Sequence, residues 1–358
     1  MLFVKKYTNS LLTSFARLTL LGGSLFLISI PVLQAGQLAQ SAVDTSAIPV
    51  TIITASEADN KPLPYYKIAP DTYFLYGNIA EVDDKNRGFN GNAGFVVTRE
   101  GVVVIDSLGT PKLGKRLIAT VRHVTKLPIK YLVITHNHPD HSYGAIAFKN
   151  IPGIRIIGHE GTLKYLDSEN MNGSVAFRRS LIGPDMQGFK GVAPDILVGG
   201  KRFDHYDFKL GGKTFAVYNT GQHHSFGDLV VHQVEGRQLW ISDLAFNHRS
   251  TYMGDGHSRE VLEAMDWLRK TFPDTRLMIP GHGSAQTAPF TMVEKTYSYV
   301  KRLRDQMREA VKSGTDLETA VRLSDFPDWH DAPLYHENHK KNANFIYLEM
   351  EQEAFFGK

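Results

Sequence analysis

The segment IKYLVITHNHPDH, residues 129–141, decides the fold, because an apolar run leads directly into a dense group of metal-binding side chains. Residues 129–134 have the composition of a short buried strand. The side chains that follow are His136, His138, Asp140 and His141. An isolated histidine is usually a hydrogen-bonded core or surface residue, but three His and one Asp so close together favour a metal site. The segment therefore predicts a rigid strand that presents metal ligands at its end.

The spacing of these four residues predicts two metal positions. If the chain is still extended at His136 and His138, their side chains point to the same face and reach one cation. Pro139 makes the chain turn, so Asp140 and His141 are directed at a second position. Two divalent cations about 3.5–4 Å apart are a known catalytic arrangement. A dinuclear site is therefore expected.

Three further apolar strands lead into His or Asp residues downstream. Residues 215–219 precede the doublet His223-His224, residues 238–242 precede Asp243, and residues 276–280 precede His282. Four strand ends that converge on one edge of a sheet would close a coordination sphere. The sequence therefore predicts that these side chains meet the 136–141 group.

These motifs resemble those of the metallo-β-lactamase superfamily. The H-x-H-x-D-H motif, a Gly/His segment ending in Asp228, a strand ending in Asp243 and the P-G-H-G segment at 280–283 occur in the family's order, between Ile68 and Ala288. The resemblance implies an α/β fold, an αβ/βα sandwich of two mixed β-sheets with helices outside and two metals at one edge. The layout is most similar to the zinc hydrolases associated with quinoprotein relay and sulfur oxidation.

The resemblance also implies a role for each ligand residue. It assigns His136, His138 and His224 to the first metal, Asp140, His141 and His282 to the second, and Asp243 to both. His224 is preferred over His223 because it stands four residues before Asp228, as the family's ligand does. His223 is then expected to orient a neighbour or face the substrate. Asp106 ends another strand at the same edge, and is expected either to accept a hydrogen bond from a ligand imidazole or to cap a turn.

The ligand set predicts the cofactor and the chemistry. Imidazole and carboxylate ligands suit Zn²⁺, with two ions per chain expected, and a second site rich in oxygen also accepts Fe or Mn. Two cations that share a water lower its pKa from about 15.7 toward 7. The expected enzyme is a zinc-dependent metallo-hydrolase whose metal-bridged hydroxide attacks a small ester, thioester, lactone or amide. Asp140 is the expected catalytic residue, because it can orient that nucleophile.

Three alternative functions stay open. A mononuclear iron sulfur or persulfide dioxygenase would use a subset of the same ligands. A β-lactamase is disfavoured, because the chain has no cysteine for the subclasses that need a thiolate, and the remaining subclass generally lacks an Asp at position 243. A non-catalytic metal-binding accessory of a periplasmic redox system would bind metal without turnover.

The first residues have the pattern of an export signal. Lys5, Lys6 and Arg17 precede the apolar run 18–33, and no acidic residue occurs before Asp44. An uncleaved anchor or a core helix are the alternatives. We expect a signal peptide over 1–35, a linker over 36–64, a catalytic domain over 65–290 and a C-terminal helical extension over 291–358. The mature protein is then periplasmic or secreted, with no stable membrane anchor after cleavage.

Charge and composition limit the partners. Forty basic residues less the three in the leader leave 37, against 37 acidic ones, so the mature chain is formally neutral. Neutrality argues against a surface that follows a phosphate backbone, so no nucleic-acid partner is expected. With 42% hydrophobic and 22% charged residues the chain can bury an ordinary core. The expected partner is a small-molecule substrate, and the sequence indicates no oligomeric state.

Patterning elsewhere predicts the surrounding elements. Strands are expected at 72–76, 93–97 and 102–106, and helices at 112–125, 292–313 and 342–355. Residues 170–208 are rich in Gly and Pro, so a long loop is expected there, either a lid or an insertion. Its Met171, Phe177, Met186 and Phe189 either contact substrate or pack beneath the loop. Residues 252–257 are a second candidate wall, and His330, His336 and His339 form either a polar surface cluster or part of a substrate-recognising flap.

Overall fold

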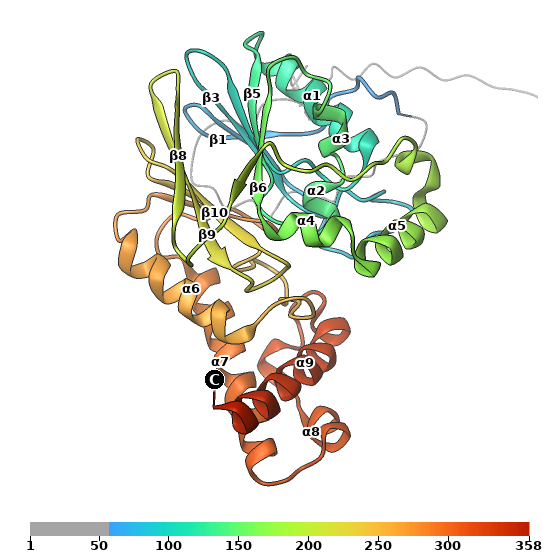
Figure 1. The fold of residues 1–358 in the computed structure, drawn as a ribbon, viewed down its shortest axis with the longest axis vertical. Helices are drawn as coiled ribbons and strands as arrows, with labels where there is room; N and C mark the ends of the chain where they lie inside the picture. Colours follow the sequence, from blue (N-terminus) through green and yellow to red (C-terminus); the bar gives the residue numbers. More distant parts are fainter. Residues whose placement is uncertain (1–56, 358) are drawn as a thin grey trace, which may run out of the picture. The chain divides into compact units, whose positions relative to one another are not determined.

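In residues 57–357, the part of the chain that the computed structural model describes, the first seven strands form one sheet (Figure 1). Its order is β1 (Tyr66–Ala69), β2 (Thr72–Leu75), β3 (Ala93–Val97), β4 (Val102–Ile105), β5 (Ile129–Val133), β6 (Arg155–His159) and β7 (Ile196–Val198). Pairs from β1 to β4 are antiparallel and pairs from β4 to β7 are parallel. Parallel neighbours need a crossover, which α1 (Pro111–Val124) supplies between β4 and β5.

The second sheet contains the remaining described strands. Its order is β12 (Leu277–Pro280), β11 (Gln238–Ser242), β10 (Asp228–Gln233), β9 (Lys213–Gly221) and β8 (His205–Leu210). All its pairs are antiparallel except β11 with β12, which the helix α6 (Ser258–Thr271) connects. Both sheets are therefore mixed, as the sequence predicted.

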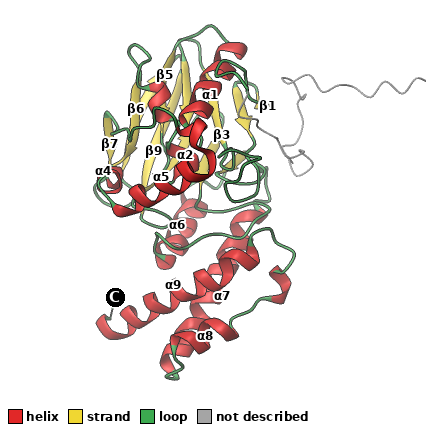
Figure 2. Ribbon diagram, turned by 90° about the vertical axis from the view of Figure 1, so that its right-hand side faces the viewer, coloured by secondary structure: helices red, strands yellow, loops and turns green. Residues whose placement is uncertain are grey.

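Helices flank the two sheets (Figure 2), and apolar side chains hold these layers together. Side chains between the sheets include Val103, Val133, Phe215 and Trp240. The helices α1 and α3 (Ala145–Phe148) cover the outer face of the first sheet. Helix α6 covers the outer face of the second sheet, and α7 (Thr291–Lys312), α8 (Leu317–Leu323) and α9 (Tyr335–Phe356) continue the same apolar cluster beyond α6. The predicted αβ/βα sandwich with a C-terminal helical region is confirmed.

Local sequence explains why α1 lies where it was expected. Thr110 caps the helix by accepting a hydrogen bond from the Leu113 backbone nitrogen, and Pro111 occupies the first turn. Leu113, Leu117 and Val121 are buried at helical spacing against the first sheet. The three predicted N-terminal strands also form, each within one residue of its expected end.

The prediction of a long loop over residues 170–208 is wrong. This segment contains most of α5 (Glu169–Ile182), the 3₁₀ helix η1 (Gly183–Met186), β7 and the start of β8. The Ser168 side chain caps α5 by accepting from the Met171 backbone nitrogen. The helix was hidden because its buried positions are few, and one of them, Arg178, is charged. Two short helices precede it, α2 (Pro139–Ser142) and α4 (Gly161–Leu166).

The C-terminal helices differ from the prediction in one boundary. Helix α7 matches its expected range, but α9 begins at Tyr335, seven residues before the predicted start at Asn342. Its first turns bury polar side chains, so the apolar pattern did not reveal them. His339 is buried between the hydroxyls of Tyr299 and Ser324, so it does not belong to a polar surface cluster. The 3₁₀ helix η2 (Pro327–Trp329) precedes this region.

The described chain begins with a segment anchored to α1. The Leu63 backbone nitrogen donates to Thr120 Oγ1 at 2.8 Å, and Arg116 Nε donates to the Lys61 carbonyl at 2.9 Å. The predicted signal peptide and most of the predicted linker lie outside the described residues, and the domain boundaries stay predictions. Among the helices of residues 57–357, none is long and apolar enough to cross a membrane.

Candidate metal centre

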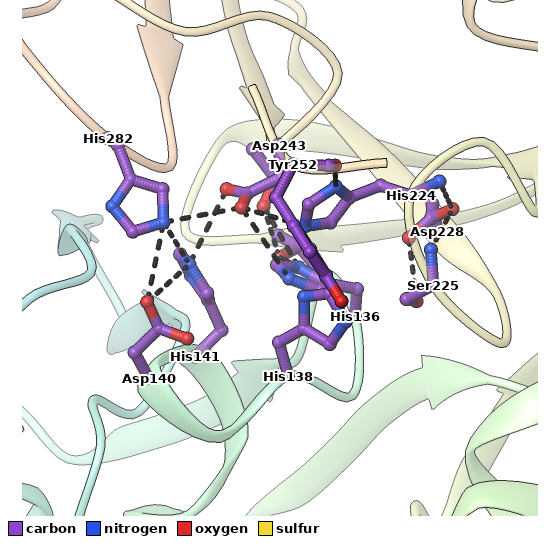
Figure 3. A network of polar contacts seen from close by, with 12 residues as sticks. His136, His138, Asp140, His141, His224, Ser225, Asp228, Asp243, Tyr252 and His282 are labelled. Atoms are coloured by element: carbon purple, nitrogen blue, oxygen red, sulfur yellow. Dashed lines mark hydrogen bonds and ion pairs between the residues drawn. The ribbon is translucent and has the colours of Figure 1, made fainter. Parts of the chain in front are cut away.

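The ends of four strands bring seven His and Asp side chains together at one edge of the sandwich (Figure 3). The first cluster consists of His136, His138, His224 and Asp243, and the second cluster consists of Asp140, His141 and His282. Within each cluster one potential ligand atom per residue lies within 4.8 Å of all the others. The residues follow β5, begin α2, connect β9 to β10, and follow β11 and β12. Every residue predicted as a metal ligand therefore lies in one of the two clusters.

The Asp243 carboxylate lies between the clusters (Figure 3). Its Oδ2 is 3.0 Å from His224 Nε2 of the first cluster, and its Oδ1 is 3.5 Å from His141 Nε2 of the second. His282 Nε2 lies 3.3 Å from Asp243 Oδ2 and 3.3 Å from Asp140 Oδ2. One carboxylate thus faces members of both clusters, which is the geometry of a bridging ligand.

Backbone proximity explains the glycine of the P-G-H-G segment. A Cβ atom at Gly281 would lie 1.9 Å from Asp243 Oδ1. The Gly281 backbone nitrogen donates to the Ser242 carbonyl at 2.8 Å, which holds the ends of β11 and β12 together. Any larger residue at position 281 would therefore displace the carboxylate between the clusters.

Each of the five histidines has its other ring nitrogen held by a neighbour. His141 Nδ1 lies 2.9 Å from Asp106 Oδ2, the contact that was expected for Asp106. The remaining partners are Ser242 Oγ for His136 Nδ1 at 3.3 Å, Asp255 Oδ2 for His138 Nε2 at 3.0 Å, the Tyr252 carbonyl for His224 Nδ1 at 3.1 Å, and the Asn90 carbonyl for His282 Nδ1 at 2.8 Å. Metal-binding histidines characteristically have such a partner, which fixes the tautomer and the ring orientation.

Unpartnered atoms show that the site fits a cation. His136 Nε2, His224 Nε2 and Asp243 Oδ1 are buried, and none makes a hydrogen bond in the described part of the chain, although His224 Nε2 lies 3.0 Å from Asp243 Oδ2. Buried polar atoms are nearly always partnered, so three such atoms in one cluster need an explanation. Imidazole nitrogens and carboxylate oxygens directed at one another are the ligands that zinc prefers. The residues present therefore fit bound metal.

The electrostatics of the site also favour a bound cation. Burial lowers the pKa of His141, but Asp243, Asp140 and Asp106 raise it more, to about 10. Burial raises the pKa of the Asp140 carboxyl, while His141, His282 and Arg178 outweigh it and hold that pKa well below its usual range. The carboxylates thus stabilise positive charge at the centre of the site, and a divalent cation would meet the same demand.

The two histidines of the doublet His223-His224 have different surroundings in the structure. His224 belongs to the first cluster, whereas His223 Nε2 lies 3.2 Å from Thr220 Oγ1 and His223 Nδ1 lies 3.7 Å from Asp228 Oδ2. Asp228 also accepts from the His224 backbone nitrogen at 2.8 Å, so it fixes the loop that carries both. His223 is buried and joins neither cluster.

A cavity of about 330 Å³, here called the metal cavity, opens beside the clusters. From the segment predicted as a second wall, Tyr252 and Asp255 line it. Phe177 of α5 also lines it and is 57% exposed, whereas Met186 packs with Tyr143 and Tyr165 away from it. The other candidates, namely Met171, Phe189, His330, His336 and His339, are not among its lining residues.

The sequence did not indicate several of the residues that line the metal cavity, including five with an amide or basic side chain. These are Asn90, Arg178, Arg249, Asn338 and Lys341. They lie in loops and helices rather than at strand ends. The pattern of an apolar strand followed by His or Asp, which identified the metal ligands, therefore does not identify them. The charged position Arg178 in an otherwise weakly amphipathic segment was the only available signal.

A sandwich of two mixed sheets with two His/Asp clusters at one edge defines a class of metal-dependent hydrolases. The sequence matches the metallo-beta-lactamase superfamily over residues 86–282. The chain belongs to this superfamily, whose members are mostly metal-dependent hydrolases.

Similar proteins include β-lactamases and alkylsulfatases. Metallo-beta-lactamase IND-1 of Chryseobacterium indologenes is 22% identical over 197 residues, which are 54% of this chain and 72% of that protein. A linear primary-alkylsulfatase of Pseudomonas sp. is 29% identical over 85 residues, 24% of this chain and only 15% of that protein. Among solved structures, the sec-alkylsulfatase Pisa1 of Pseudomonas sp. matches with a TM-score of 0.64 at 17% identity, over 80% of this chain and 50% of its own. This structural likeness supports the fold.

Proposed function

We propose that the protein is an exported dinuclear zinc hydrolase that acts on a small ester, thioester, lactone or amide. The observation that carries the proposal is the position of Asp243, whose two carboxylate oxygens face His224 in the first cluster and His141 in the second. A mononuclear site would have no need for a carboxylate between two sets of ligands. Divalent cations held there would polarise a substrate oxygen and lower the pKa of a bound water.

We propose that Asp140 accepts a hydrogen bond from the attacking water. Its side chain lines the metal cavity, and its Oδ2 accepts a hydrogen bond from Asn90 Nδ2 at 3.2 Å. Its low pKa keeps the carboxylate ionised, so it can accept a hydrogen bond from an attacking water and orient that water. The hydrogen bond from Asn90 holds the Asp140 carboxylate at the edge of the cavity, 3.3 Å from His282 Nε2 of the same cluster.

Elemental analysis of the mature protein tests the metal assignment. We expect about two zinc ions per chain, and fewer in both Asp243→Ala and His282→Ala. Asp207→Ala on the exposed face of β8 and His257→Ala, whose side chain is 56% exposed, are matched controls that should keep full occupancy. One iron per chain that survives Asp243→Ala, together with oxygen consumption, would favour the sulfur dioxygenase instead.

A substrate panel tests the reaction. It should contain activated esters, thioesters, lactones and amides, together with β-lactams and sulfate esters, because the similar proteins include a β-lactamase and alkylsulfatases. Asp140→Asn should lose most of any hydrolysis that the wild type shows while keeping its fold. Full zinc occupancy without turnover of any compound would favour a metal-binding accessory protein of a redox system.

Export is a separate part of the proposal. It is supported by Lys5, Lys6 and Arg17 ahead of the apolar run 18–33. N-terminal sequencing of the protein recovered from the periplasm or the medium should find a start close after residue 35. Recovery of the full-length chain from the cytoplasm would contradict it.

A further inference from the structure

The metal cavity contains two buried guanidinium groups that the proposed hydrolysis does not use. Arg178 of α5 is 4% exposed, and Arg249, in the loop after β11, is 9% exposed. A buried charge is costly unless an opposite charge compensates it. In residues 57–357, however, no carboxylate oxygen lies within the 4.0 Å of an ion pair from either group. Both arginines therefore have donors available for an anion that the chain itself does not provide.

Arg249 has N–H donors without acceptors when His282 adopts the tautomer that metal binding requires. Its Nη1 lies 3.0 Å from His282 Nδ1, and its Nε donates to the Ser250 carbonyl at 3.3 Å. A His282 whose Nε2 is free to bind metal carries its proton on Nδ1 and donates it to the Asn90 carbonyl, 2.8 Å away. That nitrogen cannot then accept from Arg249. The guanidinium needs another acceptor, and an acceptor can reach it from the metal cavity, which Arg249 lines.

Arg178 is held in place by weak contacts. Its Nη1 donates to the Gly109 carbonyl at 3.4 Å, and its guanidinium lies 5.8 Å from the centre of the Tyr143 ring. Burial lowers the pKa of Arg178, and the more distant carboxylates of Asp140 and Glu81 oppose this shift only in part. The Asp140 carboxylate lies beyond ion-pair distance of Arg178 and accepts a hydrogen bond from Asn90 Nδ2 at 3.2 Å. A planar guanidinium in this position suits bidentate binding of a carboxylate or sulfate.

Helix α9 adds an unpartnered amide to the same cavity. Asn338 is 1% exposed and lines the cavity, and its Nδ2 has no hydrogen-bond partner among the described residues. Lys341, one turn along the helix, lines the cavity too. Of the acidic residues in the lining besides the metal clusters, Asp255 is engaged by His138 and Asn170, and Glu81 is exposed. Two buried acceptors of the lining, Asn90 Oδ1 and Asp243 Oδ1, also lack a hydrogen-bond partner among the described residues. Asp243 belongs to the metal clusters and Asn90 offers one neutral oxygen, so neither compensates the charges of the two guanidinium groups.

We propose that Arg178, Arg249 and Asn338 form an anion subsite, and that the substrate carries a carboxylate or sulfate group that binds there. The inference rests on the proposed hydrolysis at the adjacent clusters and names the substrate class for it. It also makes the C-terminal helices a part of the substrate site, through Asn338. A charged ligand hydrogen-bonded by a buried guanidinium gains about 1.5–3 kcal/mol, or about tenfold to a hundredfold in affinity.

Paired esters test this substrate class on the zinc-loaded full chain. Mono(4-nitrophenyl) glutarate and 4-nitrophenyl butyrate share a leaving group and differ in one carboxylate, and 4-nitrophenyl sulfate distinguishes a sulfate ester from a carboxylate. We expect the ratio of kcat/KM for the charged substrate over the neutral ester to fall at least about tenfold in Arg178→Gln and in Arg249→Gln. Arg179→Gln, on an exposed neighbour of Arg178, is the matched control and should keep the wild-type ratio. Equal kcat/KM for charged and neutral substrates in the wild type would overturn the proposal.

A binding measurement separates failure of this inference from failure of the proposed hydrolysis. Calorimetric titration with benzoate, benzenesulfonate and benzyl alcohol requires no turnover. We expect one or both anions to bind, the alcohol not to bind, and the affinity to fall in Arg178→Gln, Arg249→Gln and Asn338→Ala but not in Arg179→Gln. Anions that bind equally to all five proteins would be held by the metals alone, and the subsite would be refuted even if esters are hydrolysed. Arginine-dependent binding without any hydrolysis would uphold the subsite and refute the hydrolase.

Discussion

The Oδ2 atom of Asp106 lies 2.9 Å from the Nδ1 atom of His141, so a carboxylate at the end of β4 orients a histidine at the start of α2. The Asp106 carboxylate is itself held by the Thr135 backbone nitrogen at 2.8 Å and by the Thr135 hydroxyl at 2.9 Å. Because Asp106 accepts from Nδ1, the proton of a neutral His141 stays on Nδ1 and leaves Nε2 free for a cation.

Asp106→Asn should therefore weaken metal binding at the second cluster. An asparagine tolerates the backbone at this position, where φ is +60°, but its amide donates to Nδ1 and favours the tautomer with the proton on Nε2. We expect the zinc affinity of the second cluster to fall about 10–100-fold, measured by competition with a coloured chelator. Asp207→Asn on exposed β8 is the control. Unchanged affinity in Asp106→Asn would show that Asp106 only caps a turn.

The histidine doublet gives a second test. His224→Asn should reduce zinc content to about one ion per chain, because it removes a nitrogen that lies 3.0 Å from Asp243 Oδ2. His223→Asn should keep both ions, because its ring contacts Thr220 and Asp228 outside the clusters. The measurement is elemental analysis after dialysis. Loss of metal in His223→Asn alone would reverse the assignment.

The metal clusters could be predicted from the sequence because their residues follow strands. A buried strand such as residues 129–133 has a clear apolar signature, and each group of ligands directly follows such a strand, so His136 and Asp243 were expected to meet. Residues of the metal cavity lack such a signature. Arg178 lies on a helix with few buried apolar positions, and Asn338 lies in helical turns whose buried side chains are polar. Their burial depends on tertiary packing, which periodicity does not encode.

Asn342 of α9 links the C-terminal helices to the first cluster. Its Oδ1 accepts from the Met253 backbone nitrogen at 2.9 Å, and its Nδ2 donates to the Thr251 carbonyl at 2.9 Å. These two bonds enclose Tyr252, whose carbonyl lies 3.1 Å from His224 Nδ1. The side chain of Asn342 thus fixes the backbone that orients a predicted metal ligand.

Asn342→Ala should affect both stability and metal retention. It leaves the buried Met253 backbone nitrogen without a partner and the Thr251 carbonyl with only Ser250 Oγ at 3.3 Å, so we expect the free energy of unfolding to fall by about 1–3 kcal/mol. It also frees the Tyr252 carbonyl, so zinc should be released faster to excess chelator. Asn172→Ala, at an exposed position of α5, should change neither quantity. Reduced stability with unchanged zinc release would separate Asn342 from the metal site.

The buried His339 should make stability depend on pH. Its ring nitrogens lie 3.0 Å from the hydroxyls of Tyr299 and Ser324, and burial, aided by Lys340, lowers its pKa to about 4. Between about pH 4 and the ordinary pKa of about 6.5, His339 is protonated in the unfolded chain but neutral in the folded protein. Stability from this group is therefore complete above pH 6.5 and is lost as the pH falls toward 4, by an amount on the order of 3 kcal/mol.

His339→Gln removes this titration and retains groups that can bond both hydroxyls. Urea unfolding of the chelator-treated proteins between pH 4 and pH 7.5 should show a smaller loss of stability on acidification in His339→Gln than in the wild type. His336→Gln, at an exposed position of the same helix, should follow the wild type. Chelation keeps metal release out of the comparison, and the remaining titrating groups are common to all three proteins. Parallel profiles for His339→Gln and the wild type would show that His339 accepts a proton in the folded state as readily as in the unfolded chain.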